Sequence, residues 1–519
     1  MDHATLVARH AQRYGGKTAV VFGARRWSFA DVNRRANAIA HGLLELGIKT
    51  GDRVATLSRN RPQHIEILFG KSKIAAVDVA LNSRLSPEEI VWQLNDCGAT
   101  ALFAGAEQWR RIAPHRGDLE TVRDVIVLDG AVSETIAYEE FVGGHRTTDV
   151  RLPGDARAPG RIFYTGGTTG RAKGVVVTWQ SDLAVTRNLL LDLVPDLGAR
   201  DVFLGLQPLY HAVGTFILPC WIRGTTHVVV EDFDAARAFD AVERERVTVI
   251  KTVPTVLARL TAAPDVKTRD LRSVRTIIYG ASPMPVEQLK TALAVFGPVF
   301  VQNYGQSEAP MTICLLRKED HVVDGPPHQV ARLASIGRPY TMVRVKVAAD
   351  DGREVPAGEL GEILVQGDHV MEGYWKNPDA TGETLRDGWI HTRDIGRADE
   401  DGFVFLVDRK SEMIITGGLN VYPQEVEQVL YQHPAVFEAS VFGVPDARWG
   451  ETVKAAVVLK PAATADADEL MDFCRARLAS YKKPTTVDFH AELPKSDTGK
   501  ILRRALQEPY WKGRDRRIH

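Results

Sequence analysis

Short apolar runs alternate with amphipathic stretches along the first part of the chain. Between residues 53 and 129 the runs RVATLS, AVDVALN, ATALFA and DVIVLD have the composition of strands, and PQHIEILFGKSKIA and SPEEIVWQLNDCG carry apolar residues at helical spacing. Strands that alternate with helices are typical of βαβ units, which build parallel sheets covered by helices. The pattern therefore predicts an α/β fold for this part of the chain.

The same alternation returns between residues 234 and 304. A helical stretch DAARAFDAVERERV leads to the strand VTVIKTV, and the strands VRTIIYG and PVFVQNYG flank the helix PVEQLKTALAVFG. Two of these strands run into small or polar residues, at 279–283 and 302–305. Since ligands of open α/β sheets bind at the carboxyl ends of strands, both segments are candidate walls of a site.

The pattern changes after about residue 408. The segments EVEQVLYQHP, ASVFGV, TVKAAVVLK, DELMDFCRARL and TVDFH predict a small α+β domain, and its entry, DRKSEMIITGG, combines charges, an apolar run and paired glycines as a hinge would. The predicted fold is thus α/β. A large N-terminal domain of helix-flanked, parallel-rich sheets spans residues 1–408, and a small mobile α+β domain spans 409–519.

Composition narrows the class of protein. Of 519 residues, 44% are hydrophobic and 25% are charged, which is the balance of a soluble globular protein, and the net charge is −1. Such a charge provides no field for nucleic acid or an anionic membrane, so we expect neither as a partner. No apolar run approaches the roughly 20 residues that span a bilayer, and the N-terminus lacks a signal-peptide pattern. We therefore expect no integral membrane segment.

Cysteine usage points to a reducing compartment. The chain has four cysteines, far apart and without a CxxC pair: Cys97, Cys220, Cys314 and Cys474. This spacing argues against a structural zinc site and against a disulfide framework. A cytoplasmic location is the simplest expectation.

The segment YTGGTTGRAKG, residues 164–174, lies between two strand-like runs. Its glycines let backbone amides wrap an anion, and its threonines and Lys173 add hydroxyl donors and a positive charge, which suits a polyphosphate. It is not a Walker A loop, because Arg171 and Ala172 separate the glycine from the lysine and a strand follows. Taken alone, the segment also fits an ordinary surface turn.

Further motifs decide between these readings. Seven motifs in order resemble those of the adenylate-forming superfamily, which includes acyl-CoA synthetases, peptide-synthetase adenylation domains and firefly luciferase. They cover nearly the whole chain: YTGGTTGRAKG, PLYHAVG (208–214), YGASPMP (279–285), QNYGQSE (302–308), DGWIHTRDIG (387–396), DRKSEMIITGGLNVYP (408–423) and PKSDTGK (494–500). The set is most similar to that of acyl- or aryl-CoA synthetases.

The resemblance implies an ATP-dependent acid–thiol ligase that uses Mg²⁺ and coenzyme A (CoA). A carboxylate would attack the α-phosphate of ATP to give an acyl-adenylate and pyrophosphate. The small domain would then rotate, and the thiol of CoA would displace AMP to give an acyl-CoA thioester. The implied partners are small molecules: a carboxylic acid, ATP and CoA. The resemblance does not decide whether the protein forms a homodimer.

The resemblance also implies residue roles. Lys500 would stabilise the charge that grows during adenylation, Glu308 would bind Mg²⁺, and Ser411 would be the hinge. His211 would act at the acyl pocket, although a lone histidine can equally be a packed core residue. CoA would contact Gly417, Gly418 and Trp449. ATP would be bound by Thr165, Gly166, Gly167, Thr168, Thr169, Gly170, Lys173, Gly280, Ala281, Ser282, Asn303, Tyr304, Gly305, Ser307, Asp394 and Arg409.

The expected acyl pocket is mostly apolar. Amino-acid-activating relatives carry an aspartate just after the PLYHAVG region, whereas residues 214–216 are Gly-Thr-Phe here, so an amino-acid substrate is not expected. An uncharged aliphatic, alicyclic or aromatic acid fits best. The expected wall consists of Tyr210, His211, Val213, Phe216, Ala281, Val301, Ala309, Pro310 and Met311.

Four positions depart from the family pattern. Gly166 replaces a usual serine of the phosphate loop, and Ala172 replaces a usual proline. Arg393 stands where a glycine normally precedes the ribose-binding aspartate, which would put bulk and charge beside Asp394. Leu419 replaces a residue that is commonly acidic or polar.

Two alternatives to a CoA ligase remain. One keeps adenylation but delivers the acyl group to a carrier-protein thiol or to a luciferase-type oxidation. The stretch WGE, residues 449–451, and the hinge glycines resemble CoA ligases and favour CoA. The other is a non-catalytic regulator that binds nucleotide or acyl-CoA. The presence of Lys500, Glu308 and Asp394 together argues against it.

Overall fold

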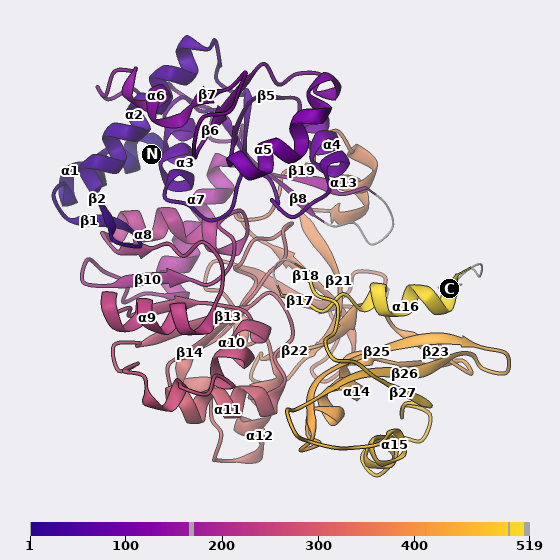
Figure 1. The fold of residues 1–519 in the computed structure, drawn as a ribbon. Helices are drawn as coiled ribbons and strands as arrows, with labels where there is room; N and C mark the ends of the chain where they lie inside the picture. The colour runs from indigo at the N-terminus through magenta and orange to yellow at the C-terminus, as the bar shows by residue number, and fades with distance from the viewer. Residues whose placement is uncertain (1, 166–170, 410–411, 497–498, 513–519) are drawn as a thin grey trace.

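The computed structural model describes residues 2–165, 171–409, 412–496 and 499–512. A large part holds two mixed sheets and a third, antiparallel one, and a smaller part at the C-terminal end holds a fourth sheet (Figure 1). This arrangement confirms the predicted class, an α/β N-terminal region followed by a small α+β region.

The first sheet supplies the floor of the site. Its six central strands run parallel, and its edges are antiparallel. The order is β16 (Arg338–Pro339), β15 (Cys314–Leu316), β14 (Phe300–Tyr304), β13 (Thr276–Gly280), β12 (Val249–Lys251), β10 (Val202–Gly205), β11 (Thr226–Val228), β1 (Thr18–Phe22) and β2 (Arg25–Ser28).

The second sheet carries the phosphate-loop hairpin at one edge. Strands β8 and β9 pair antiparallel there, whereas β3, β4, β5 and β6 run parallel as the βα pattern predicts. The order is β19 (Gly373–Tyr374), β9 (Lys173–Thr178), β8 (Pro159–Thr165), β4 (Val77–Ala80), β3 (Arg53–Leu57), β5 (Ala99–Ala104), β6 (Asp124–Val127) and β7 (Ile136–Ala137).

The two remaining sheets are mainly antiparallel. The third contains β17 (Arg344–Ala348), β18 (Gly361–Gln366), β20 (Leu385–Arg386), β21 (Trp389–Ala398) and β22 (Val404–Arg409); the alternation of strands with helices did not predict it. The fourth contains β23 (Ile414–Thr416), β24 (Leu419–Val421), β25 (Val436–Asp446), β26 (Gly450–Leu459) and β27 (Thr486–Phe489).

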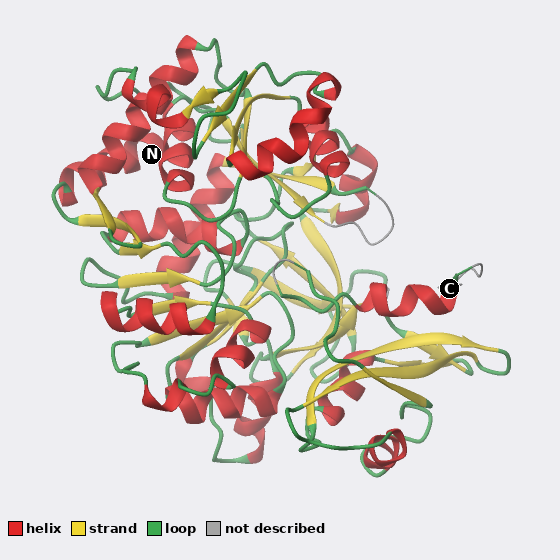
Figure 2. Ribbon diagram, in the orientation of Figure 1, coloured by secondary structure: helices red, strands yellow, loops and turns green. Residues whose placement is uncertain are grey.

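Helices pack against the sheets in both the large part and the C-terminal part (Figure 2). Helices α9, α10 and α11 cover the outer face of the first sheet. The α-helices of the described residues are α1 (His3–Tyr14), α2 (Phe29–Glu45), α3 (Gln63–Lys73), α4 (Pro87–Cys97), α5 (Ala106–Ile112), α6 (Tyr138–Gly143), α7 (Trp179–Asn188), α8 (Ile217–Arg223), α9 (Ala235–Glu245), α10 (Pro254–Thr261), α11 (Val286–Phe296), α12 (Pro327–Ala331), α13 (Pro378–Thr384), α14 (Pro423–Leu430), α15 (Ala467–Arg475) and α16 (Arg503–Trp511).

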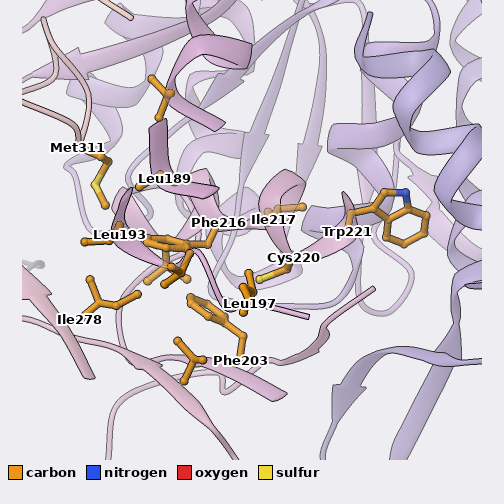
Figure 3. Close-up of a cluster of buried hydrophobic side chains, with 14 of the residues drawn as sticks. Leu189, Leu193, Leu197, Phe203, Phe216, Ile217, Cys220, Trp221, Ile278 and Met311 are labelled. Carbon is orange, nitrogen blue, oxygen red and sulfur yellow. The ribbon is translucent and has the colours of Figure 1, made fainter. Parts of the chain in front are cut away.

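The largest hydrophobic cluster lies on the inner face of the first sheet. Phe203 and Ile278 from this sheet pack with Phe216, with Leu189 and with Met311 (Figure 3). The rings of Phe203 and Phe216 are stacked with their centres 5.1 Å apart. The cluster thus joins the sheet to the segments around α7 and α8.

The four cysteines are free and buried. Burial raises the pKa of the Cys474 thiol to about 11 and that of Cys97 to about 12, so neither is ionised near neutral pH. No helix among the described residues is long and apolar enough to cross a membrane.

Candidate active site

One cleft joins the large part of the chain to the C-terminal part. It encloses about 1570 Å³ of empty space, including solvent at its mouth. Its walls include residues from the ends of β13 and β14, from β21 and β22, and from the C-terminal segment around residue 500. The predicted site residues that line it are Ala281, Ser282, Asn303, Tyr304, Gly305, Asp394, Arg409 and Lys500.

Strands β13 and β14 approach each other closely at their carboxyl ends. A Cβ atom on Gly280 would lie 2.1 Å from the carbonyl oxygen of Asn303, so only glycine fits there. The next residue, Ala281, has a φ of +71° and turns the chain away from the sheet. This turn brings the segment after β13 to the cleft.

Asp394 is a buried acid of the cleft with several partners. It is only 3% exposed, and its Oδ2 accepts hydrogen bonds from the Tyr304 hydroxyl and, at 2.6 Å, from the Gln306 amide. Its Oδ1 lies 3.2 Å from Nε of Arg409. Asp394 and Arg409 face each other across the ladder of β21 and β22, so backbone pairing sets their separation. An anion with two good acceptor oxygens suits paired hydroxyls.

The neighbours of Asp394 have shifted pKa values. Burial and then the carboxylate of Asp394 raise the pKa of the Tyr304 hydroxyl, so it stays a donor. Burial alone would lower the pKa of Arg409, but the carboxylates of Asp394 and Glu412 outweigh burial and raise it. Arg409 is therefore a permanent positive charge at the cleft.

Lys500 reaches the same cleft from a tight turn. The backbone N–H of Ser496 donates to the Lys500 carbonyl at 2.7 Å, and Gly499, with a φ of +84°, precedes the lysine. The Lys500 side chain is open to the solvent of the cleft, yet the surrounding protein and then the charge of Arg409 lower its pKa. The lysine is therefore a cation held close to a second cation, an arrangement that favours an anion between them.

A half-buried arginine, Arg503, lies three residues after Lys500. The Arg503 guanidinium forms ion pairs with Asp408 at 3.4 Å, with Glu412, and with Glu427 at 2.9 Å. These carboxylates come from the end of β22, the following segment and α14. The pairs tie the Lys500 segment to the start of the C-terminal part.

Glu308 lies in a second group of polar residues. Its Oε1 accepts a hydrogen bond from the Tyr374 hydroxyl at 2.6 Å, and the Lys173 ammonium lies 4.9 Å from the centre of the Tyr374 ring. Tyr374 is on β19, which pairs with β9 and so brings Glu308 near the phosphate-loop hairpin. Thr165 and Lys173 face each other across that hairpin. Gly166, Gly167, Thr168, Thr169 and Gly170 lie outside the described residues, as does Ser411.

The chemistry of Glu308 fits a hard cation that is shared with phosphates. Among the described residues, no three or more His, Cys, Asp and Glu side chains gather as a metal site. Mg²⁺ commonly takes one or two carboxylates and completes its shell with water and phosphate oxygens. Glu308 beside Lys173 meets that requirement.

The expected acyl wall lies mostly within the core. Val213, Phe216, Val301, Ala309 and Met311 belong to the cluster on the inner face of the first sheet and are buried. They pack against side chains there, and of the expected wall residues Ala281 is the one that lines the cleft among the described residues. The structure therefore places these five residues in a packed cluster, which the sequence did not predict.

The remaining predicted residues lie elsewhere. Tyr210 lines a separate cavity beside Arg84 and Lys495, and the ring of His211 is 4.7 Å from that of Tyr210. Ser307 and Pro310 are half-buried in the segment after β14. The CoA candidates do not line the cleft among the described residues: the backbone N–H of Gly417 donates to the Trp449 carbonyl at 2.9 Å, Gly418 follows, and Trp449 is exposed.

Arg393 does not place its charge beside Asp394. Its guanidinium is exposed and pairs with Glu383 at 3.3 Å, and its backbone N–H donates to Glu362. Its φ of +61° lies in the left-handed region, where a glycine costs least. Arg393 therefore differs from the family's glycine in the strain of its backbone and does not add charge to the site.

Several cleft residues were not found from the sequence. Gln306, Glu412 and Arg503 line the cleft, and Tyr374 holds the predicted site residue Glu308. Gln306 and Glu412 lie inside two of the seven motifs, so the sequence did contain an indication that these residues belong to the site. Nothing in the local sequence marked Tyr374, because its contact with Glu308 depends on the pairing of β19 with β9.

Two family models match the chain. One, described as AMP-binding enzyme, matches residues 7–375, and the other, described as AMP-binding enzyme C-terminal domain, matches residues 425–500. The two matches together contain most of the residues that line the cleft.

Similar proteins carry out related ligations. A feruloyl-CoA synthase from Amycolatopsis is 37% identical over 95% of this chain and 96% of its own. A fatty acid–[acyl-carrier-protein] ligase from Streptomyces coeruleorubidus is 37% identical over 98% of this chain and 96% of its own. The crystal structure of an anthranilate CoA ligase in complex with anthranoyl-AMP matches with a TM-score of 0.91 at 27% identity, covering 98% of this chain and 97% of that one.

Proposed function

This chain belongs to the AMP-binding enzyme family, and from that membership we propose that it is an ATP-dependent carboxylic acid:CoA ligase that forms AMP. The reaction has two steps. The acid and ATP give an acyl-adenylate and pyrophosphate, and CoA then gives an acyl-CoA thioester and AMP.

The observation that carries the proposal is the position of Lys500 in the cleft. This lysine comes from the C-terminal part, yet it lines the same cleft as Asn303, Tyr304 and Asp394 of the large part. A nucleotide held by Asp394 and Arg409 would place its phosphates within the positive field of Lys500. This convergence of residues supports adenylation as the first step.

In that step a carboxylate oxygen of the acid attacks the α-phosphorus of ATP, and the bond from that phosphorus to the bridging oxygen of pyrophosphate breaks. Negative charge is then shared between the attacking and the leaving groups. The ammonium of Lys500 is carried by a flexible side chain and can contact the carboxylate and the α-phosphate together. This contact lowers the energy of the transition state. Thr165 and Lys173 would hold the leaving pyrophosphate, and Mg²⁺ at Glu308 would offset its charge.

In the second step the sulfur of CoA attacks the acyl carbonyl, and AMP leaves. The residues proposed for CoA, Gly417, Gly418 and Trp449, lie outside the cleft, so a movement of the C-terminal part between the steps is needed. We propose that residues 409–519 move as a unit about a hinge near Ser411. Lys500 would leave the cleft as the glycines enter.

The proposed substrates are aliphatic, alicyclic or aromatic acids. Relatives of this chain are named for feruloyl and fatty acyl groups, so the family includes proteins named for an aromatic and for an aliphatic acid. His211, beside Tyr210, is proposed to border the acyl group near the reacting carbonyl. Other predicted wall residues would have to move apart to admit a substrate.

A panel of carboxylic acids tests the function. Each acid is incubated with ATP and Mg²⁺, with and without CoA, and AMP, pyrophosphate and thioester are identified by mass. We expect AMP and acyl-CoA in equal amounts for at least one aliphatic or aromatic acid. Lys500→Ala should reduce acyl-adenylate formation by about 10²- to 10³-fold while thioester formation from supplied acyl-adenylate continues.

The same panel separates the alternatives. Pyrophosphate release without thioester, followed by transfer to an added acyl-carrier protein, would favour the carrier-protein ligase, an alternative that a 37% identical relative supports. Nucleotide binding without release of pyrophosphate for any acid would indicate a regulator. A Lys500→Ala variant that loses only the second step would contradict the role given to this lysine.

A further inference from the structure

Lys251 is a buried lysine that no step above uses. It ends β12 and has no exposed surface. Its ammonium donates to the carbonyl oxygen of Thr252 and to Oδ1 of Asn303, both at 3.2 Å. Both acceptors are neutral, so the positive charge is not compensated by either.

Comparison with other buried lysines makes Lys251 unusual. Lys71 and Lys73 are equally inaccessible, but each contacts a carboxylate, Asp78 at 2.8 Å and Asp149 at 2.9 Å respectively. Among the residues that the structure describes, no carboxylate forms an ion pair with Lys251. Burial lowers the pKa of Lys251 to about 7. An unpaired buried ammonium is costly, and such groups are normally paired.

The register of the first sheet fixes the direction of this side chain. Lys251 of β12 pairs with Ile278 of β13, and Gly280 of β13 pairs with Asn303 of β14. The Lys251 side chain therefore reaches Asn303 across β13 at Gly280. Ile278 points into the hydrophobic cluster on the inner face (Figure 3). Lys251 therefore shares that face with the apolar residues of the expected acyl wall.

Asn303 connects the ammonium to the cleft. Its side chain accepts from Lys251 and donates to the Met311 carbonyl at 3.3 Å, and the residue also lines the cleft. A group that entered from the cleft and replaced the Asn303 amide would meet the ammonium.

We propose that Lys251 binds a second, anionic oxygen group of the acyl substrate, so that the preferred acids are dicarboxylic. The proposal rests on the ligase function given above and departs from the expectation of an uncharged acid. One carboxylate reacts at the Lys500 end of the site, and the other accepts hydrogen bonds from Lys251. A carboxylate is the partner that Lys71 and Lys73 already have and Lys251 lacks.

Matched pairs of acids test the proposal. Glutaric, adipic, suberic and terephthalic acids are each compared with their monoamide, which has the same size without the second charge. We expect kcat/KM to be about 100-fold higher or more for one diacid than for its monoamide, because a site built around a polar partner rejects a substrate that lacks it. Lys251→Met should remove this preference and leave kcat/KM for the monoamide nearly unchanged.

A second lysine provides the control. Lys318 is partly buried near the opposite end of the same sheet, where it donates to the Arg275 carbonyl and the Thr276 hydroxyl. Lys318→Met should leave the preference intact. Equal turnover of diacid and monoamide by the unaltered enzyme would overturn the proposal, as would a Lys251→Met variant that loses activity equally on both.

Calorimetric binding of the same pairs to the protein with AMP reads the acid site without turnover. A diacid that binds more tightly than its monoamide, and loses this advantage in Lys251→Met, supports the acid site even if no acid is activated. That combination would refute the ligase function alone. Turnover of monoamides at the rate of diacids would refute the Lys251 proposal alone.

Discussion

Tyr374 contacts two residues assigned to the phosphates. Its hydroxyl donates to Glu308, and its ring lies against Lys173. Burial and then the charge of Glu308 raise the pKa of the hydroxyl, so it remains a donor. A donor on one carboxylate oxygen fixes the direction of the other, which is how outer residues orient a metal ligand.

Tyr374→Phe should therefore weaken the response to Mg²⁺. We expect the Mg²⁺ concentration for half-maximal adenylation to rise by about 10- to 100-fold, the usual cost of losing such a partner. The measurement is a Mg²⁺ titration of pyrophosphate release at saturating ATP. Tyr510→Phe is the matched control, since Tyr510 donates to Asp488 at the same 2.6 Å far from Glu308. An unchanged titration in Tyr374→Phe would remove Glu308 from the metal site.

The sequence was most informative for residues inside motifs. Asp394, Arg409 and Lys500 were predicted to act together, and they line one cleft. Tyr374 and Lys251 were missed for a common reason. Their partners are 66 and 52 residues away along the chain, so only strand pairing brings them into contact.

At the scale of elements, the turn before Lys500 is held by one glycine. Gly499 has a φ of +84°, and a Cβ atom there would lie 2.5 Å from the hydroxyl oxygen of Thr255 on α10. The turn therefore fits against the large part only if residue 499 has no side chain. The position of Lys500 depends on that contact.

Gly499→Ala should slow adenylation more than it destabilises the protein. We expect kcat for pyrophosphate release to fall by about 10- to 100-fold, since a displacement of about 1 Å can cost about 100-fold, while thioester formation from supplied acyl-adenylate persists. Gly402→Ala is the control, because Gly402 has a similar φ of +78° with no atom within 4 Å of the added Cβ. If both variants slow adenylation equally, backbone strain rather than docking of the turn is responsible.

Elements were predicted well where strands and helices alternate and poorly elsewhere. The parallel strands β3 to β6 and β12 to β14 came directly from apolar runs between helices. The antiparallel sheet of residues 344–409 was missed, although β21 alternates buried and exposed residues over much of its length. Strand β19, which belongs to the second sheet, and helix α13 lie between β18 and β20 along the chain, so no regular spacing predicts this sheet.

Across the whole molecule, four buried histidines make stability depend on pH. Burial lowers the pKa to about 4 for His64, His227, His321 and His369. In the unfolded chain these groups titrate near 6.5, so below that pH the unfolded state binds more protons. Stability should therefore fall between about pH 6.5 and pH 4, by up to about 3 kcal/mol for each histidine.

His227→Leu should flatten this dependence. The ring of His227 packs 4.9 Å from that of Phe203, so an apolar replacement fits the surroundings. Urea denaturation at several values between pH 7 and pH 4.5 measures the free energy of unfolding. His328→Leu, at an exposed position, should leave the dependence as it is. An equal loss of stability with acid in His227→Leu and the unaltered protein would contradict the assignment.

The buried cysteines have a practical consequence for watching the proposed movement of the C-terminal part. All four native thiols are shielded, and burial raises their pKa, so thiol-reactive dyes should leave the folded protein unlabelled. Two cysteines introduced at exposed sites, one in each part, would then carry the only fluorophores. Energy transfer between them would report the rotation turnover by turnover, with no need to remove a native residue.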